Sequence, residues 1–309
     1  MNWKKNKYYF LLILLAACRS DQQAEQSALI GPTLEVNALA DLLDDPSIQL
    51  IDFRKAAEFE QGHIPGAINL WRRDIEDPNH THAGMMATAQ QLETRFSKLG
   101  IKNNTTLVVY DGDGSCDASR FWWVLKQYGH DNVIILNGGI AAWSGAGNQL
   151  SSKPNSLANS DFKLPVNSPQ NIMSIDQASL FELLDTDAII IDARTQEEYS
   201  GARMKNGASR AGRIPGSKHL DWKFSVLLQE DHRFKSAEAL QEELDFLGAD
   251  KHIPIVVYCH SGVRSAHLTF VLTQLLGYTN VKNYDGSWIQ WSALAELPIS
   301  QDSLITLQN

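Results

Sequence analysis

Residues 255–266, IVVYCHSGVRSA, contain a short β-branched run, a tight polar loop and the start of a helical pattern. Residues 107–118, LVVYDGDGSCDA, repeat that order at a constant offset of 148. The same offset relates Trp143 to Trp291, so the chain carries one unit twice. We therefore predict two tandem domains of the same architecture.

Earlier landmarks recur in the same order in both copies. Each copy has an Asp-x-Arg triplet after an apolar run, beginning at Asp52 and Asp192, and a later Ile-Pro-Gly turn, beginning at Ile64 and Ile214. Short β-branched runs alternate with helical patterns such as residues 265–276. This alternation is typical of an α/β fold in which helices flank a parallel sheet on both faces.

The N-terminal residues differ from the rest of the chain. Residues 1–17 combine three lysines with an apolar run too short to span a bilayer, which is typical of a secretory signal peptide. The run ends in Leu-Ala-Ala-Cys18, which resembles the bacterial lipobox and implies that Cys18 is lipidated. The alternative is an ordinary signal followed by a chance cysteine. Residues 18–30 are polar and predict a tether.

The lipobox predicts a location in the bacterial cell envelope, anchored by lipid and facing the periplasm. Arg19 and Ser20 are not the Asp-type signal that retains lipoproteins at the inner membrane of some bacteria, which favours the outer membrane. We expect no other attachment to the membrane.

The remaining chain divides into three predicted parts. These are a non-catalytic domain at residues 31–150, a linker rich in Ser, Asn and Pro at residues 151–172, and a catalytic domain at residues 173–309. A length of 309 residues suits two domains, and the net charge of -9 disfavours nucleic-acid binding. Cys116 and Cys259 are too few for a disulfide framework, although a single bridge between them stays open.

The loop after the strand at residues 255–258 is the predicted chemical centre. Cys259 follows that strand, and in a parallel sheet ligands bind at the carboxyl ends of the strands. The positive end of the next helix, a cup of backbone N–H groups and Arg264 stabilise a thiolate. Cys259 is thus placed as a nucleophile; the alternative is a small buried residue at a strand end. The loop and helix start that form this cup are predicted to bind the substrate through His260, Ser261, Gly262, Val263 and Arg264.

Two further stretches resemble the tandem-domain rhodaneses, the family of thiosulfate and 3-mercaptopyruvate sulfurtransferases. Residues 59–70, FEQGHIPGAINL, resemble the N-terminal signature of that family, and residues 284–288, YDGSW, resemble the C-terminal one. Gln290 stands where the family usually has Glu. The resemblance covers essentially everything after the tether and implies two rhodanese-like domains, of which the second is catalytic.

The implied mechanism is sulfur transfer without a metal or organic cofactor. Thiosulfate would load a persulfide onto Cys259, and cyanide, another thiophile or a protein acceptor would remove the sulfur. Asp111 occupies the place of Cys259 in the first copy and cannot carry a persulfide, so the first domain is expected to be a lid and cleft wall. Cys116 is either a resolving thiol or a packed one.

Related phosphatases and arsenate reductases are the competing enzyme class. Four residues separate Cys259 from Arg264, whereas those enzymes have a loop one residue longer, which holds a tetrahedral oxyanion. The shorter loop favours sulfur chemistry. A persulfide carrier without turnover is the third alternative.

The identity of the sulfur donor rests on weaker signals. Ser261 resembles the 3-mercaptopyruvate enzymes, which usually have Thr where this chain has Arg264. Those enzymes also carry an Arg, an Asp and a His at places aligned here with Glu198, Arg73 and Gly84. A positive rim suits dianionic thiosulfate better, and thiosulfate is the predicted donor, with 3-mercaptopyruvate as the alternative. The rim is formed by Arg72, Arg73 and Arg264.

Three further arginines are candidates. Arg194 is interpreted either as an internal ion pair with Asp192 and Glu198 or as a donor contact. Arg210 and Arg213 lie in an insertion relative to the first copy and are candidates for the cleft. One short stretch contains Asp77, His80 and His82. Their spacing is not that of metal ligands, so we predict a solvated loop and no metal site.

Overall fold

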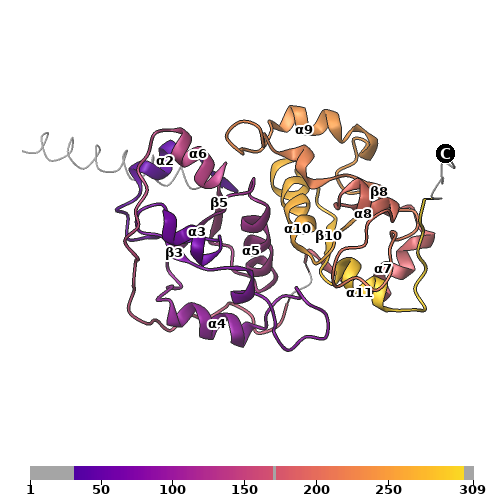
Figure 1. Ribbon diagram of the computed structural model, residues 1–309, viewed down its shortest axis with the longest axis horizontal. Helices are drawn as coiled ribbons and strands as arrows, with labels where there is room; N and C mark the ends of the chain where they lie inside the picture. The colour runs from indigo at the N-terminus through magenta and orange to yellow at the C-terminus, as the bar shows by residue number, and fades with distance from the viewer. Residues whose placement is uncertain (1–30, 170–171, 303–309) are drawn as a thin grey trace, which may run out of the picture.

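The computed structural model describes residues 31–169 and 172–302 and shows two lobes side by side (Figure 1). The predicted signal peptide, the lipidation site Cys18 and the tether lie outside the described residues. None of the described helices is long and apolar enough to cross a membrane.

The first lobe is a five-stranded parallel sheet with the strand order β1-β5-β4-β2-β3. Its strands are β1 (Thr33–Leu34), β2 (Ile48–Asp52), β3 (Ile68–Asn69), β4 (Thr106–Tyr110) and β5 (Val133–Leu136). Its helices are α2 (Val36–Asp41), α3 (Ala56–Gln61), the 3-10 helix η1 (Arg72–Asp74), α4 (Ala89–Lys98), α5 (Cys116–Gln127) and α6 (Gly139–Gly145).

The second lobe repeats this sheet with the order β6-β10-β9-β7-β8. Its strands are β6 (Ser174–Ile175), β7 (Ile189–Asp192), β8 (Lys218–His219), β9 (Ile255–Tyr258) and β10 (Val281–Tyr284). Its α-helices are α7 (Gln177–Glu182), α8 (Gln196–Ser200), α9 (Ala237–Glu243), α10 (Val263–Phe270) and α11 (Ser287–Ala293). Shorter helices are η2 (Leu183–Asp185), η3 (Trp222–Ser225), η4 (Asp245–Leu247) and the π-helical η5 (Val271–Leu275).

Helices cover both faces of each sheet, because the central strands are apolar on both sides. In β4, Leu107 and Val109 contribute to one core, whereas Val108 and Tyr110 contribute to the other. The strand β9 alternates in the same way. Continuous apolar strands of this kind are typical of parallel sheets. The prediction of two α/β domains of one architecture is confirmed.

The two lobes meet through α5 and α10, which lie side by side in the middle of the molecule (Figure 1). The ring of Trp122 on α5 meets Phe270 on α10 edge to face, with centroids 4.9 Å apart. The core on this side continues from one sheet to the other and includes Cys259. Both helices begin at the loops that follow β4 and β9, so the interface brings those two loops together.

The predicted linker packs against the first lobe over its described part. Phe162 is fully buried, and its ring lies 5.2 Å from that of Phe96 on α4. The Phe162 N–H donates to Ser97, and the Leu164 N–H donates to Glu93. Phe162 and Leu164 of this mostly polar stretch join the core, and Val166 packs against it.

Candidate active site at the end of strand β9

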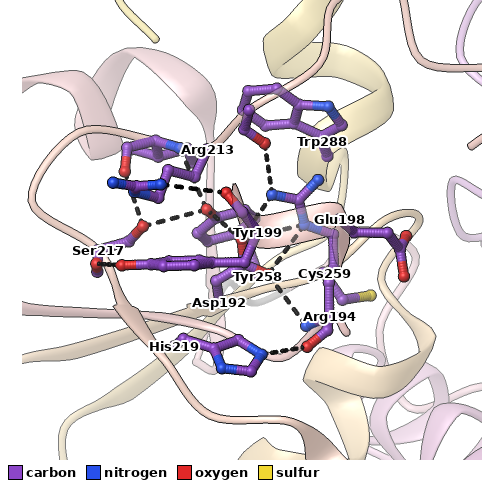
Figure 2. A network of polar contacts seen from close by, with 12 residues as sticks. Asp192, Arg194, Glu198, Tyr199, Arg213, Ser217, His219, Tyr258, Cys259 and Trp288 are labelled. Atoms are coloured by element: carbon purple, nitrogen blue, oxygen red, sulfur yellow. Dashed lines mark hydrogen bonds and ion pairs between the residues drawn. The ribbon is translucent and has the colours of Figure 1, made fainter. Parts of the chain in front are cut away.

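A polar network at the end of β7 surrounds Arg194 (Figure 2). The Arg194 guanidinium donates to the Asp192 carboxylate, with a shortest distance of 2.6 Å, and to the Gly212 carbonyl at 2.7 Å. The Tyr258 hydroxyl donates to the same carboxylate at 2.6 Å, and the Trp288 ring lies 4.6 Å from the guanidinium carbon. Arg194 is 2% exposed, so its guanidinium is buried and bonded within the protein.

The first lobe contains the same network. Arg54 donates to Asp52 and to the Gly62 carbonyl, and the Tyr110 hydroxyl donates to Asp52. Because the network occurs in both lobes, and this lobe has Asp111 at the position of Cys259, its shared role is to brace the fold. The expected pairing of Arg194 with Glu198 is wrong: Arg194 precedes helix α8, so helical i,i+4 spacing does not apply to it.

The loop after β4 shows what the cup of N–H groups can hold. The buried Asp111 carboxylate accepts four backbone N–H groups at 2.8 to 3.0 Å. Burial and the charge of Asp117 raise the pKa of Asp111 to about 6, against the lowering effect of these hydrogen bonds. The donors are the N–H groups of Asp113, Ser115, Asp117 and Ala118. The cup of the first lobe is therefore filled by a carboxylate of the chain itself.

Cys259 occupies the corresponding cup of the second lobe. The thiol is buried, with 1% of the residue exposed, and the Ser265 hydroxyl donates to Sγ at 3.4 Å. Burial raises its pKa, but Arg264, the Ser265 hydroxyl and the N–H groups of Ser265 and Ser261 together hold the pKa below its ordinary value. At the offset of 148, these two N–H groups match those of Asp117 and Asp113.

Ser287 holds the shape of the cysteine loop from the start of α11. Its hydroxyl accepts the N–H groups of Cys259 and Gly262, both at 3.1 Å, and donates to the Tyr284 carbonyl. Ser287 adopts a φ of 47°, a strained conformation for a residue with a Cβ. Gly262 must be glycine, because a Cβ there would lie 2.7 Å from Oδ1 of Asp285.

Arg264 reaches across the loop to Glu198 on α8. Its two terminal nitrogens donate to the two carboxylate oxygens of Glu198 at 2.7 and 3.0 Å. Burial would raise the pKa of Glu198, but the Arg264 hydrogen bond and charge lower it to about 2. In Figure 2 the Glu198 carboxylate and the Cys259 sulfur both point away from the Arg194 network, toward the same side. The charge of Arg264 is thus shared between the thiolate and Glu198.

Replacing Arg264 by glutamine is expected to raise the pKa of Cys259 by about one to three units. The substitution removes the cation that favours the thiolate and leaves the Glu198 carboxylate beside it. Because only the thiolate reacts, the midpoint of iodoacetamide alkylation of Cys259 against pH moves upward. The double variant Arg264→Gln, Glu198→Gln is the control and recovers part of the shift. An unchanged midpoint in Arg264→Gln would show that this cation does not act on the thiol.

The other predicted loop residues lie around Cys259. Val263 begins α10, and Ser261 contributes its N–H group to the cup. The Nε2 of His260 lies 3.0 Å from the Asn206 carbonyl. Burial, together with the charge of Lys205, lowers the pKa of His260 to about 4, so His260 is neutral at pH 7.

The structure does not bring Arg210, Arg213 or Arg73 to this loop by any hydrogen bond or ion pair between described residues. Arg210 donates to four backbone carbonyls between residues 291 and 297. Arg213 pairs with Asp302. Arg73 is exposed on η1. The first two arginines are held by the C-terminal segment, which corrects the expectation that they approach the cleft.

Cys116 and Arg72 lie on the first-lobe side of the interface. Cys116 is a free, buried thiol whose pKa is raised well above its ordinary value by burial and by Asp117. At the offset of 148, it stands where Arg264 stands in the second lobe. Arg72 pairs with Asp117. A protonated, packed thiol fits these surroundings, and Cys259 is likewise free, so the two cysteines form no bridge.

The first lobe closes over the cysteine loop. A Cβ on Gly84 would lie 2.9 Å from the Ser261 Cβ, so the two backbones approach closely. Arg120 on α5 pairs with Asp285 at 2.6 Å and donates to the Gly84 carbonyl at 2.8 Å. These contacts place Gly84 and Arg120 of the first lobe against the cysteine loop and Asp285 of the second lobe.

Several contributors were missed by sequence reasoning. Glu198 was considered only as a departure from a donor site and as a partner of Arg194, although it is the partner of Arg264. No local pattern links Arg120 to Asp285. Lys205 lies in the same insertion as Arg210 and Arg213, so the insertion itself was the signal that could have found it.

The chain is similar to known proteins along most of its length. Residues 35–146 and 176–294 match the model of the rhodanese-like domain. The sulfur carrier protein TtuD of Thermus thermophilus is 34% identical over 269 residues, covering 84% of this chain and 93% of that protein. A Mycobacterium bovis protein named "Putative thiosulfate sulfurtransferase 1" is 34% identical over 252 residues, covering 79% and 88%. The crystal structure of SseA from Escherichia coli, described among 3-mercaptopyruvate sulfotransferases, matches with a TM-score of 0.73 at 28% identity, covering 84% of this chain and 99% of that one.

Proposed function

The chain belongs to the family of proteins built from rhodanese-like domains, and on that premise we propose that it is a sulfurtransferase that uses thiosulfate. The observation that carries the proposal is the pair of matching cups. One holds the Asp111 carboxylate on four backbone N–H groups, and in the other the N–H groups at two of those positions, Ser261 and Ser265, act on the Cys259 sulfur. A cup that accepts an anion in one lobe supports a thiolate, and then a persulfide, in the other.

The proposed cycle has two steps. The Cys259 thiolate attacks the outer sulfur of thiosulfate, a new S–S bond forms at Cys259, and the S–S bond of thiosulfate breaks with its electron pair leaving on sulfite. Cyanide or another thiophile then attacks the terminal sulfur of the persulfide, and the S–S bond breaks to return the Cys259 thiolate. Each step conserves atoms and electrons, so no cofactor or external oxidant is needed.

The donor is tested by direct competition of substrates. The soluble chain lacking residues 1–18 is incubated with cyanide and either thiosulfate or 3-mercaptopyruvate, and thiocyanate is measured. We expect a higher kcat/KM with thiosulfate, because Glu198 stands where an arginine would be needed to bind the carboxylate of 3-mercaptopyruvate. A higher value with 3-mercaptopyruvate would keep the persulfide mechanism and reverse the choice of donor.

A second candidate is a persulfide carrier that passes sulfur to a protein. The relative from Thermus thermophilus, which is named a sulfur carrier protein, favours it. Such a carrier would load sulfur from thiosulfate at the same cysteine but release little thiocyanate. Rapid loading with slow discharge to cyanide would therefore identify the carrier.

We also propose that the mature chain is a lipoprotein of the cell envelope, anchored through Cys18 and facing the periplasm. The basis is the sequence of residues 1–18. Fractionation of the full-length chain tests this placement against a Cys18→Ser variant, which should lose its membrane attachment. Equal distribution of both forms would remove the anchor from the proposal.

A further inference from the structure

A dianionic donor needs positive charge beside Cys259, and the obvious arginines are already paired. Both terminal nitrogens of Arg264 bind the carboxylate of Glu198. Arg72 is paired with Asp117. Attack of a thiolate on thiosulfate brings like charges together, so an additional cation near the sulfur would lower the barrier and hold the donor.

The second lobe carries an extra segment that lies against the cysteine loop. The spacing from Asp-x-Arg to Ile-Pro-Gly is 12 residues in the first copy and 22 in the second, which inserts ten residues after α8. The Arg203 N–H donates to the Glu197 carbonyl at 2.8 Å, and His260 bonds to the Asn206 carbonyl at 3.0 Å. The segment is therefore fastened to the site on both sides of Lys205.

Lys205 precedes Asn206, whose carbonyl bonds to His260, the residue after Cys259. Its charge lowers the pKa of His260 and of Glu198, and the pKa of Lys205, an exposed residue, is itself lowered by partial burial of its ammonium group and by Arg264. The charge of Cys259 acts on Lys205 in the opposite direction. Among the described residues, none forms a hydrogen bond or an ion pair with the ammonium group of Lys205. Lys205 is thus a cation on the segment that bonds to His260, the residue after Cys259, and no described carboxylate is bound to it.

We infer that Lys205 binds the anionic end of the sulfur donor and turns the donor's outer sulfur toward Cys259. The inference rests on the proposed function and names the residue that sets its preference for a small dianion. Ser261 in the cysteine loop is uncharged. The positive charge comes instead from Lys205, in the insertion after α8, which bonds to the loop through Asn206 and His260. The first lobe has neither the insertion nor a cysteine at the position of Cys259, so the two features of the second lobe occur together.

The charge of Lys205 can be tested without turnover, by alkylation of Cys259. Iodoacetate is anionic and iodoacetamide is neutral, so the ratio of their rate constants reports positive charge beside the sulfur and cancels changes in thiol pKa. Lys205→Gln is expected to lower this ratio about fivefold at low salt, and less at high salt. Lys153→Gln, which removes an exposed lysine of the linker, is the matched control and should leave the ratio unchanged. An unchanged ratio in Lys205→Gln would overturn the inference.

Kinetics separate this inference from the function on which it rests. In Lys205→Gln the KM for thiosulfate should rise about fivefold or more, while the KM for cyanide, which meets the loaded enzyme, changes less. Turnover with an unchanged alkylation ratio would overturn the role of Lys205 and leave the function standing. A reduced ratio in a chain that transfers sulfur from neither donor would overturn the function and leave Lys205 as an anion-binding residue alone.

Discussion

Replacing Cys259 with serine is expected to abolish sulfur transfer from thiosulfate to cyanide, lowering kcat by at least about a thousandfold. A serine hydroxyl does not ionise near neutral pH and cannot carry a terminal sulfur. The fold should survive, because the two side chains are similar in size and the loop is shaped by Ser287 and Gly262. Thiocyanate production by the two purified proteins measures the effect.

Cys116→Ser is the matched control, because it makes the same substitution at the other buried thiol. Burial and Asp117 keep Cys116 protonated, so this variant should retain activity within about twofold. Loss of turnover in Cys116→Ser with a normal circular dichroism spectrum would give Cys116 a place in the reaction. Turnover retained in Cys259→Ser would remove the nucleophile from the mechanism.

Replacing Arg120 with methionine is expected to reduce the free energy of unfolding by about 3 to 5 kcal/mol. Arg120 is 1% exposed and forms the buried ion pair that joins α5 to Asp285 of the other lobe. Without it, the Asp285 carboxylate stays buried and uncompensated, and the Gly84 carbonyl loses its donor. Denaturant unfolding measures the loss, and turnover should fall with it because Gly84 packs on the cysteine loop.

Arg95→Met provides the comparison at the surface. Arg95 pairs with Asp74 at 2.8 Å but is 42% exposed, so its loss should cost less than about 1 kcal/mol. The double variant Arg120→Met, Asp285→Asn removes the stranded charge and should recover part of the stability. Equal effects of Arg95→Met and Arg120→Met would show that the buried pair does not hold the lobes together.

The fold was predictable because its evidence is local and repeated. The strand, loop and start of the helix follow one another directly in the chain at residues 107–118 and again at residues 255–266. A constant offset relates the two segments. Parallel pairing then follows from alternating strands and helices. The packing of the linker was not predictable in this way, because the burial of Phe162 depends on the surface that α4 offers to it.

Cys259 was predictable for the same reason, since its strand, cup and helix are neighbours in sequence. Its electrostatic partners were not, because they come from other elements. Glu198 lies 66 residues before Arg264, and Lys205 lies in an insertion that has no counterpart in the first lobe. No period or motif links such residues, so only the folded chain brings them together.

The duplication also separates the fold from the chemistry. Features present in both lobes, such as the Arg54 and Arg194 networks, serve the fold. Features confined to the second lobe, including Cys259, the Arg264 pair and the insertion with Lys205, are the candidates for chemistry. At the position of Cys259 the first lobe has Asp111, whose carboxylate binds the backbone N–H groups of its own loop.

The most direct test of the central claim locates the transferred sulfur. The chain is incubated with thiosulfate without an acceptor, digested under non-reducing conditions, and its peptides are weighed by mass spectrometry. We predict one added sulfur atom on the peptide that contains Cys259, removed by cyanide and absent from the Cys116 peptide. Sulfur on Cys116, or on neither cysteine, would contradict a persulfide mechanism at Cys259.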